Sequence, residues 1–123
     1  MGTTPIEPRA LTELEASVVT TLLSSSGKAG AGDYLAQVPF ARVIATWGDG
    51  SPSVDLMVPP DVAAVSGSTN GIFIDGGVTD RNGAPIGEVI LWVEDGRLGG
   101  IEYTWYTDER PKSLPDPSQI EVS

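Results

Sequence analysis

The chain of 123 residues contains no cysteine and no histidine. Without cysteine it can form no disulfide and no thiolate metal site, and its redox compartment stays open. Without histidine it lacks the commonest general base and the commonest metal ligand. Any catalysis would rest on carboxylates, Tyr, Lys, Ser or Thr, and we expect no metal and no cofactor.

Positive charge is also scarce, with 7 Lys and Arg against 17 Asp and Glu, and the formal net charge is -10. A surface this acidic repels phosphate backbones, so we expect no nucleic-acid partner. It favours solubility and a fast encounter with a basic protein partner. Charge alone argues solubility rather than function, because many proteins are simply acidic.

Long apolar runs are missing as well. No stretch approaches the roughly 18 apolar residues of a membrane span. The N-terminus carries no apolar region of a secretory signal, and its sixth residue, Ile6, is not the Ser or Thr of a myristoylation signal. We therefore expect a cytoplasmic protein with no membrane partner.

The patterns that are present indicate a single domain over residues 9–110. Residues 1–8 hold two prolines and are expected to form a flexible N-terminus, while residues 111–123 are expected to form an extended, acidic, proline-rich tail. An apolar stripe at helical spacing predicts one long helix over residues 9–25. The stripe consists of Leu11, Leu14, Val18 and Leu22. Asp33 could cap a further helical turn at residues 34–38.

The rest of the chain alternates strand-like runs with turn signals. Five strands are expected, at residues 41–47, 53–58 and 71–78 and in a hairpin within residues 85–107. Short connections place strands that are neighbours along the chain side by side. The predicted fold class is therefore α+β, with the N-terminal helix packed on a mostly antiparallel five-stranded meander sheet.

The hairpin turns at Asp95-Gly96, which suits a type I′ turn because both central residues need a positive φ. Strict alternation from this turn pairs Glu88 with Tyr103 and gathers most of the aromatic side chains on the same face. That face would hold Ile86, Glu88, Ile90, Trp92, Ile101, Tyr103 and Trp105. Both faces of the hairpin are substantially apolar. We expect both to be covered, or one to be covered and the other to be used for binding.

One constellation on this face could carry chemistry. The turn at Asn82-Gly83 brings Asp75 to the side of Glu88 and Tyr103, with Trp92 and Trp105 as further lining of a candidate ligand pocket. A carboxylate among aromatic rings has a raised pKa and can act as an acid or a base. The structural alternative is stronger: these residues belong to a core or a sheet rim, and a bulge at residues 76–77 would reverse Asp75.

The opposite face and the following segment supply a candidate partner surface. Its polar and acidic members are Glu102, Thr104, Tyr106, Asp108 and Glu109. On the second strand Asp55 is expected to point to solvent, where Arg42 could pair with it. Such a surface pair contributes under about 1 kcal/mol and does not mark a site.

Residues 87–98, Ile101-Glu102-Tyr103, residues 105–111 and residues 114–117 together resemble the C-terminal half of small bacterial α+β domains of uncharacterised function. The segment 34–38 is similar to their middle, although the Gly-Phe-Phe strand found there is replaced by a single Phe73. Some proteins of this kind are encoded beside toxins as immunity proteins. The resemblance carries no functional residue over to this chain.

Three functions remain open on this basis. The first is a non-enzymatic binding protein, which could be immunity-like, that presents an acidic surface to a basic partner. The second is a structural homodimer, and the third is a small-ligand pocket or enzyme that uses Asp75, Glu88 and Tyr103. We expect the first, and catalysis is the less favoured outcome.

Overall fold

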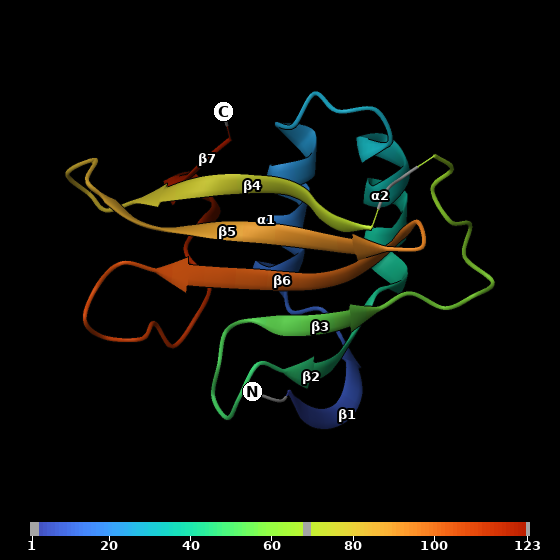
Figure 1. Ribbon diagram of the computed structural model, residues 1–123, viewed down its shortest axis with the longest axis horizontal. Coiled ribbons are helices and arrows are strands. Elements are labelled where there is room, and N and C mark those ends of the chain that lie inside the picture. The colour runs from blue at the N-terminus through green and yellow to red at the C-terminus, as the bar shows by residue number, and fades with distance from the viewer. Residues whose placement is uncertain (1–2, 68–69, 123) are drawn as a thin grey trace.

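The computed structural model describes residues 3–67 and 70–122. In these ranges two α-helices pack on one antiparallel sheet of seven strands (Figure 1). The helices are α1 (Glu13–Ser24) and α2 (Ala31–Gln37), followed by the single turns η1 (Val38–Phe40) and, near the end, η2 (Pro117–Gln119). The strands are β1 (Thr4–Ala10), β2 (Arg42–Thr46), β3 (Val54–Met57), β4 (Gly71–Thr79), β5 (Pro85–Glu94), β6 (Arg97–Trp105) and β7 (Ile120–Glu121).

The α+β class and the antiparallel sheet are confirmed, but the five-stranded meander is wrong. The strand order is β1-β2-β3-β6-β5-β4-β7. After β3 the chain crosses to β4 on the far side and returns through two hairpins, so that β6 pairs with β3. The long hairpin of β5 and β6 therefore lies in the middle of the sheet rather than at its edge.

Both ends of the chain join the sheet, which alters the predicted termini. The sequence predicted a flexible segment at residues 1–8, of which residues 1–2 lie outside the described part, but Thr4–Ala10 forms the edge strand β1 beside β2. The predicted extended tail returns to the body: Leu114 is buried, and β7 pairs with β4. Two prolines did not prevent β1, because an edge strand leaves one side without ladder hydrogen bonds.

The start of α1 is fixed by a capping box. Thr12 Oγ1 accepts the Glu15 N–H at 3.1 Å, and Glu15 Oε1 accepts the Thr12 N–H at 2.8 Å. Arg9, on β1, donates to both oxygens of Glu15 at 2.8 and 3.0 Å. The helix consequently begins four residues later than predicted, and its first turn is tied to the edge strand.

The second helix was expected only as a turn capped by Asp33. Instead α2 begins after Gly30, whose φ of 90° is the left-handed conformation that glycine adopts most easily. Tyr34 and Gln37 anchor the helix, since both are almost completely buried. Tyr34 packs edge-on against Phe73 of β4, with ring centroids 4.8 Å apart.

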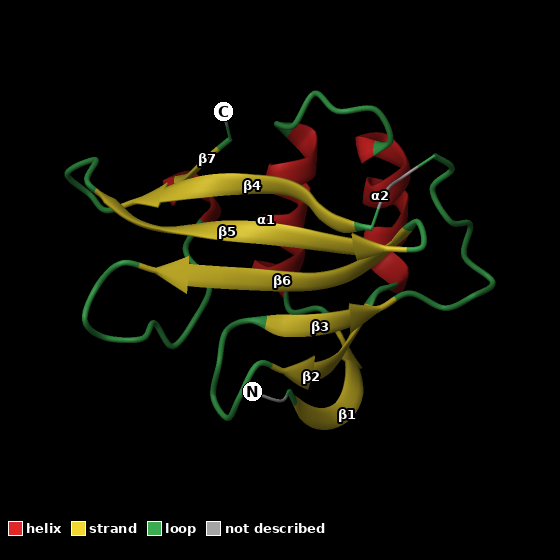
Figure 2. Ribbon diagram, in the orientation of Figure 1, coloured by secondary structure: helices red, strands yellow, loops and turns green. Residues whose placement is uncertain are grey.

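Both helices lie on the same face of the sheet (Figure 2). The core between the layers includes Val18, Val19, Leu22 and Leu23 of α1. The sheet contributes to this core from alternate positions, among them Val54, Val78, Val89, Leu91, Val93 and Ile101. The opposite face of the central strands has no helix over it, and it faces the viewer in Figure 1. In the described ranges no helix has the length and apolar character needed to cross a bilayer.

Candidate functional site

The register of the central hairpin changes after its second pair. Val93 lies opposite Leu98, as the turn predicted, but a bulge follows, and Trp92 then lies opposite Gly100. Beyond the bulge every partner is displaced by one residue, so that Tyr103 faces Val89 and Thr104 faces Glu88. Because side chains alternate between faces, a shift of one residue moves each to the other side. The predicted pairing of Glu88 with Tyr103 is therefore wrong.

Three rows of cross-strand partners define the face without helices. The first row runs Asp55, Gly100, Trp92, Ile72; the second runs Glu102, Ile90, Asp75; the third runs Thr104, Glu88, Gly77. Direct partners share a face, so these residues form one surface, which we call the open face. It combines four carboxylates with Trp92, Ile90 and Ile72, and Ile72 is 54% exposed.

Two tryptophans on this face are held by carboxylates. The Trp92 indole N–H donates to Glu102 Oε1 at 2.9 Å. The Trp47 indole N–H, from the loop after β2, donates to Asp55 Oδ1 at 2.9 Å. A tryptophan offers one hydrogen-bond donor, and in both residues that donor is occupied. The faces of the two rings are what remains to contact a ligand.

The cavity between them lies over bare backbone. Trp47, Asp55, Trp92, Glu94, Gly99 and Gly100 line a groove of about 360 Å³. A Cβ added at Gly100 would meet the Trp92 Cβ at 3.8 Å and Asp55 Oδ1 at 3.9 Å. The backbone of Gly99 and Gly100, which carries no side chains, therefore forms the floor of the groove. An indole and the carboxylate that accepts its hydrogen bond form one wall.

In the part of the chain that the structure describes, the carboxylates of the open face form no ion pair. Within residues 3–67 and 70–122 the one ion pair joins Arg9 to Glu15, on the other side of the fold. The pKa of Glu88 is raised, first because burial disfavours its carboxylate. The charge of Asp75, a hydrogen bond between the two acids that needs a proton, and the charge of Glu102 raise it further. In the part of the chain that is described, no three acidic side chains are arranged to hold a metal ion.

The structure brings some of the predicted pocket residues together and separates others. Asp75, Glu88 and Trp92 share the open face, so the predicted proximity of the two acids holds. Tyr103 lies on the helix side, almost fully buried, and burial raises the pKa of its hydroxyl. Trp105 faces Gly87 at the end of β6, away from these acids. The set of Asp75, Glu88 and Tyr103 is therefore not assembled.

The predicted partner surface is divided in the same way. Glu102 and Thr104 belong to the open face together with Glu88, which the uninterrupted register had placed on the other side. Tyr106, 62% exposed, and the exposed Asp108 and Glu109 follow the end of β6. Asp55 was expected to pair with Arg42, but it accepts the Trp47 indole, and Arg42 lies opposite Met57.

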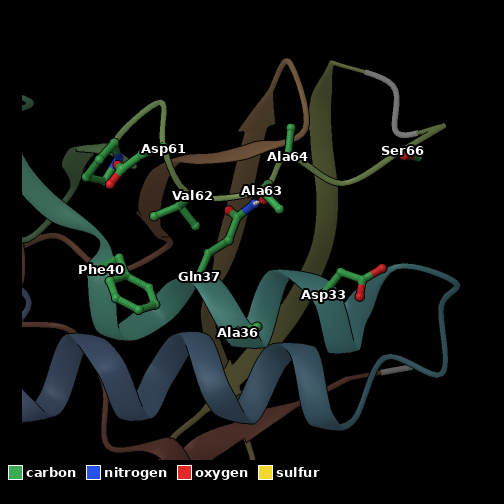
Figure 3. A pocket seen from close by; sticks show the side chains of 10 residues that line it. Asp33, Ala36, Gln37, Phe40, Asp61, Val62, Ala63, Ala64 and Ser66 are labelled. Carbon is green, nitrogen blue, oxygen red and sulfur yellow. Dashed lines mark hydrogen bonds between the residues drawn. The ribbon is translucent and has the colours of Figure 1, made fainter.

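A second and larger cavity lies on the helix side. It measures about 650 Å³ and opens between α2 and the loop of residues 59–66 (Figure 3). Gln37 lines it, but its side-chain amide is fully engaged, donating to the Ala63 and Gly96 carbonyls and accepting the Leu98 N–H. Asp33 and Asp61 lie at opposite ends of the lining in Figure 3. The side-chain amide of Gln37 is thus not free to orient a ligand in this cleft.

Sequence reasoning missed Trp47 and Asp55 as members of a site. Asp55 could have been found from its position on the solvent side of β3, because β3 pairs with β6 in the middle of the sheet. Trp47 had no such signal, because its contact with Asp55 depends on how the loop after β2 folds back.

Comparisons with protein-family models, with curated proteins and with solved structures returned no match to this chain.

Proposed function

We propose that this protein is a non-enzymatic binding protein that docks a basic protein partner on its open face. The observation that carries the proposal is the composition of that face, where Asp55, Asp75, Glu88 and Glu102 lie among the exposed Ile72 and Trp47 and the partly buried Trp92. In the described residues none of these four acids forms an ion pair. Charged residues of one sign beside an apolar patch favour a partner of the opposite sign. The net charge of -10 adds long-range attraction to the same partner.

The same charges argue against the two other functions considered. A homodimer formed through two open faces would bring like charges together, which costs free energy at the interface. Acid–base catalysis by Asp75, Glu88 and Tyr103 is disfavoured because Tyr103 is buried in the core, on the other side of the sheet from the two acids. A basic toxin is one partner that would have the proposed chemistry.

The test is a titration of isotope-labelled protein with a short peptide of alternating Arg and Gly, followed by backbone NMR shifts. We expect the largest shifts at Glu88, Ile90 and Glu102, and an affinity that falls as salt is added. Glu88→Gln and Glu102→Gln remove one charge each and should lower the affinity about two- to five-fold, as expected for a partly solvated charge pair. Gln at position 102 keeps an acceptor for the Trp92 indole.

The matched control is Asp108→Asn, which removes one charge beyond the end of β6 and should leave the affinity unchanged. If Asp108→Asn weakens binding as much as Glu102→Gln, or if the shifts gather at residues 106–109, the open face is not the docking surface. A dimer in sedimentation whose formation protects the open face from exchange would instead favour the homodimer. In that case the proposal is wrong.

A further inference from the structure

We infer that the groove between Trp47 and Trp92 is the seat of a single arginine side chain from the basic partner. This inference rests on the proposed function and specifies which part of the open face gives it selectivity. The groove is a cavity of about 360 Å³ that is lined by two tryptophans together with Asp55 and Glu94. A neighbouring cavity of about the same volume, lined by Trp47, Trp105, Glu102 and Arg110, already contains a cation of the chain.

The orientation of the two rings is fixed before a ligand arrives. Each indole N–H is bound to a carboxylate, Trp47 to Asp55 and Trp92 to Glu102, both at 2.9 Å. A carboxylate that accepts from the indole N–H polarises that bond and so increases the electron density of the ring, and it also places negative charge beside each ring. Both effects favour a cation in contact with a ring face, where the indole is the strongest of the aromatic partners.

The groove also contains acceptors for the hydrogen bonds of a guanidinium group. Asp55 uses Oδ1 for Trp47, while Oδ2 makes no hydrogen bond to the described residues. Glu94 is exposed at the rim and likewise has no ion pair in those ranges. Its neighbour across the strand pair, Arg97, lines an adjacent cavity with Asp55 and Glu94 and donates Nη2 to the carbonyls of Pro60 and Val62. Among the described residues, no Lys or Arg lines the groove itself.

Arginine fits this arrangement better than lysine. Its guanidinium is flat, so it can lie against an indole while its N–H groups reach a carboxylate in the plane. The bare backbone of Gly99 and Gly100 leaves room for the aliphatic stem between the two walls. An ammonium is a compact, strongly hydrated charge that gains less from the flat ring faces.

The experiment follows the indole N–H signals of the intact protein during titration with acetyl-arginine amide. The chain has three tryptophans, so each indole can be assigned. Trp105 is the internal control, because it shares a neighbouring cavity with Trp47 but does not line the groove. We expect the signals of Trp47 and Trp92 to shift with the arginine probe and the signal of Trp105 to stay in place. The citrulline analogue, which has the same shape without the charge, should cause no shift, and acetyl-lysine amide should bind more weakly.

Two variants and one matched control complete the test. Trp47→Leu removes one aromatic wall and should weaken the arginine probe about two- to five-fold, the effect of one exposed cation–π contact. Asp55→Asn keeps the acceptor for Trp47 but removes the charge, and should weaken it similarly. Trp105→Leu replaces a tryptophan of nearly the same exposure, 39% against 36% for Trp47, and should have no effect.

The two proposals fail in different ways. If the Arg-Gly peptide shifts Glu88 and Glu102 but the arginine probe leaves Trp47 and Trp92 unchanged, the open face binds basic partners and the arginine seat is wrong. Equal responses to the arginine and citrulline probes would also overturn the seat, because charge would then play no part. If neither the peptide nor the probe shifts any residue of the open face, both proposals are wrong.

Discussion

The buried side chain of Gln37 offers the sharpest test of how the helix layer is attached to the sheet. Gln37 is 1% exposed and makes three hydrogen bonds to backbone groups of two other segments. Its Nε2 donates to the Ala63 carbonyl at 3.0 Å and to the Gly96 carbonyl at 2.9 Å, and its Oε1 accepts the Leu98 N–H at 3.1 Å. It thereby joins α2 to the loop after β3 and to the turn of the central hairpin.

The perturbation is Gln37→Leu, which keeps the size of the side chain and removes its polar atoms. The Leu98 N–H and the Ala63 carbonyl then lose this partner, whereas the Gly96 carbonyl still accepts the Val65 N–H at 2.8 Å. Each unsatisfied buried group costs about 1–3 kcal/mol, and the apolar surface of leucine offsets part of that cost. We expect a loss of about 2–4 kcal/mol, a large part of the 5–15 kcal/mol by which a domain is normally stable.

Urea unfolding followed by circular dichroism measures this loss directly. The matched control is Gln119→Leu, because Gln119 is only half-buried and its amide bonds to Thr79 and Asp116 are partly solvated. It should lose less than about 1 kcal/mol. A third variant, Gln37→Glu, sets a carboxylate against two carbonyls and should recover stability relative to the wild type as acid protonates it. A loss for Gln37→Leu no larger than that for Gln119→Leu would refute the account.

Three further perturbations test other parts of the structure. Burial pushes the pKa of Glu15 upward, but hydrogen bonds from Arg9 and Thr12 lower it overall. The ionised Glu15 therefore stabilises the fold above the ordinary pKa of about 4.3, and this stabilisation is lost as pH falls through the lowered pKa. Glu15→Gln should cost about 1–3 kcal/mol at pH 7 and flatten the acid limb of stability against pH. The pKa of Glu88 is raised, chiefly by burial, so the wild type loses stability as pH rises from about 4.3 through the raised value. Glu88→Gln should remove that loss in urea titrations, by less than about 1 kcal/mol, while it weakens binding of the Arg-Gly peptide; a variant less stable than the wild type at pH 7 would contradict this. Gly83→Ala, at a φ of 83° in open space, should cost about 1–2 kcal/mol in thermal unfolding, and Gly96→Ala, where the new Cβ would lie 2.5 Å from the Val65 carbonyl, should cost clearly more.

The local patterns of the chain predicted α1 and the turn of the central hairpin, but not α2, β1 or the bulge in the hairpin. The apolar stripe gave α1, and the Asp95-Gly96 turn was placed correctly, with φ values of 53° and 76°. Thr12 and Glu15 carry a capping-box spacing that would also have marked the first residue of the helix. Each of these features depends on residues within a few positions of one another.

The order of the strands could not be predicted in the same way. The pairing of β3 with β6 and of β7 with β4 joins segments more than forty residues apart. Their sequences carry no complementary pattern, because the hydrogen bonds of a strand edge are the same for every residue type except proline. The preference for short connections favoured a meander, whereas the observed order places β3 beside β6.

The composition of the open face depends on two glycines. In β6 the buried apolar residues change from an even position, Leu98, to odd positions at Ile101 and Tyr103, with Gly99 and Gly100 between them. Strict alternation would have placed Glu102 under the helices, where an unpaired carboxylate costs several kcal/mol, and would have exposed Ile101 and Tyr103.

A bulge at the glycine pair resolves this conflict, since one extra residue restores the inward direction of both apolar side chains. The same bulge delivers Glu102 to the Trp92 indole and leaves the floor of the groove without side chains. The change of parity across Gly99 and Gly100 is visible in the sequence. It links the packing of the core to the formation of the candidate site, so a substitution that removed the bulge would affect both.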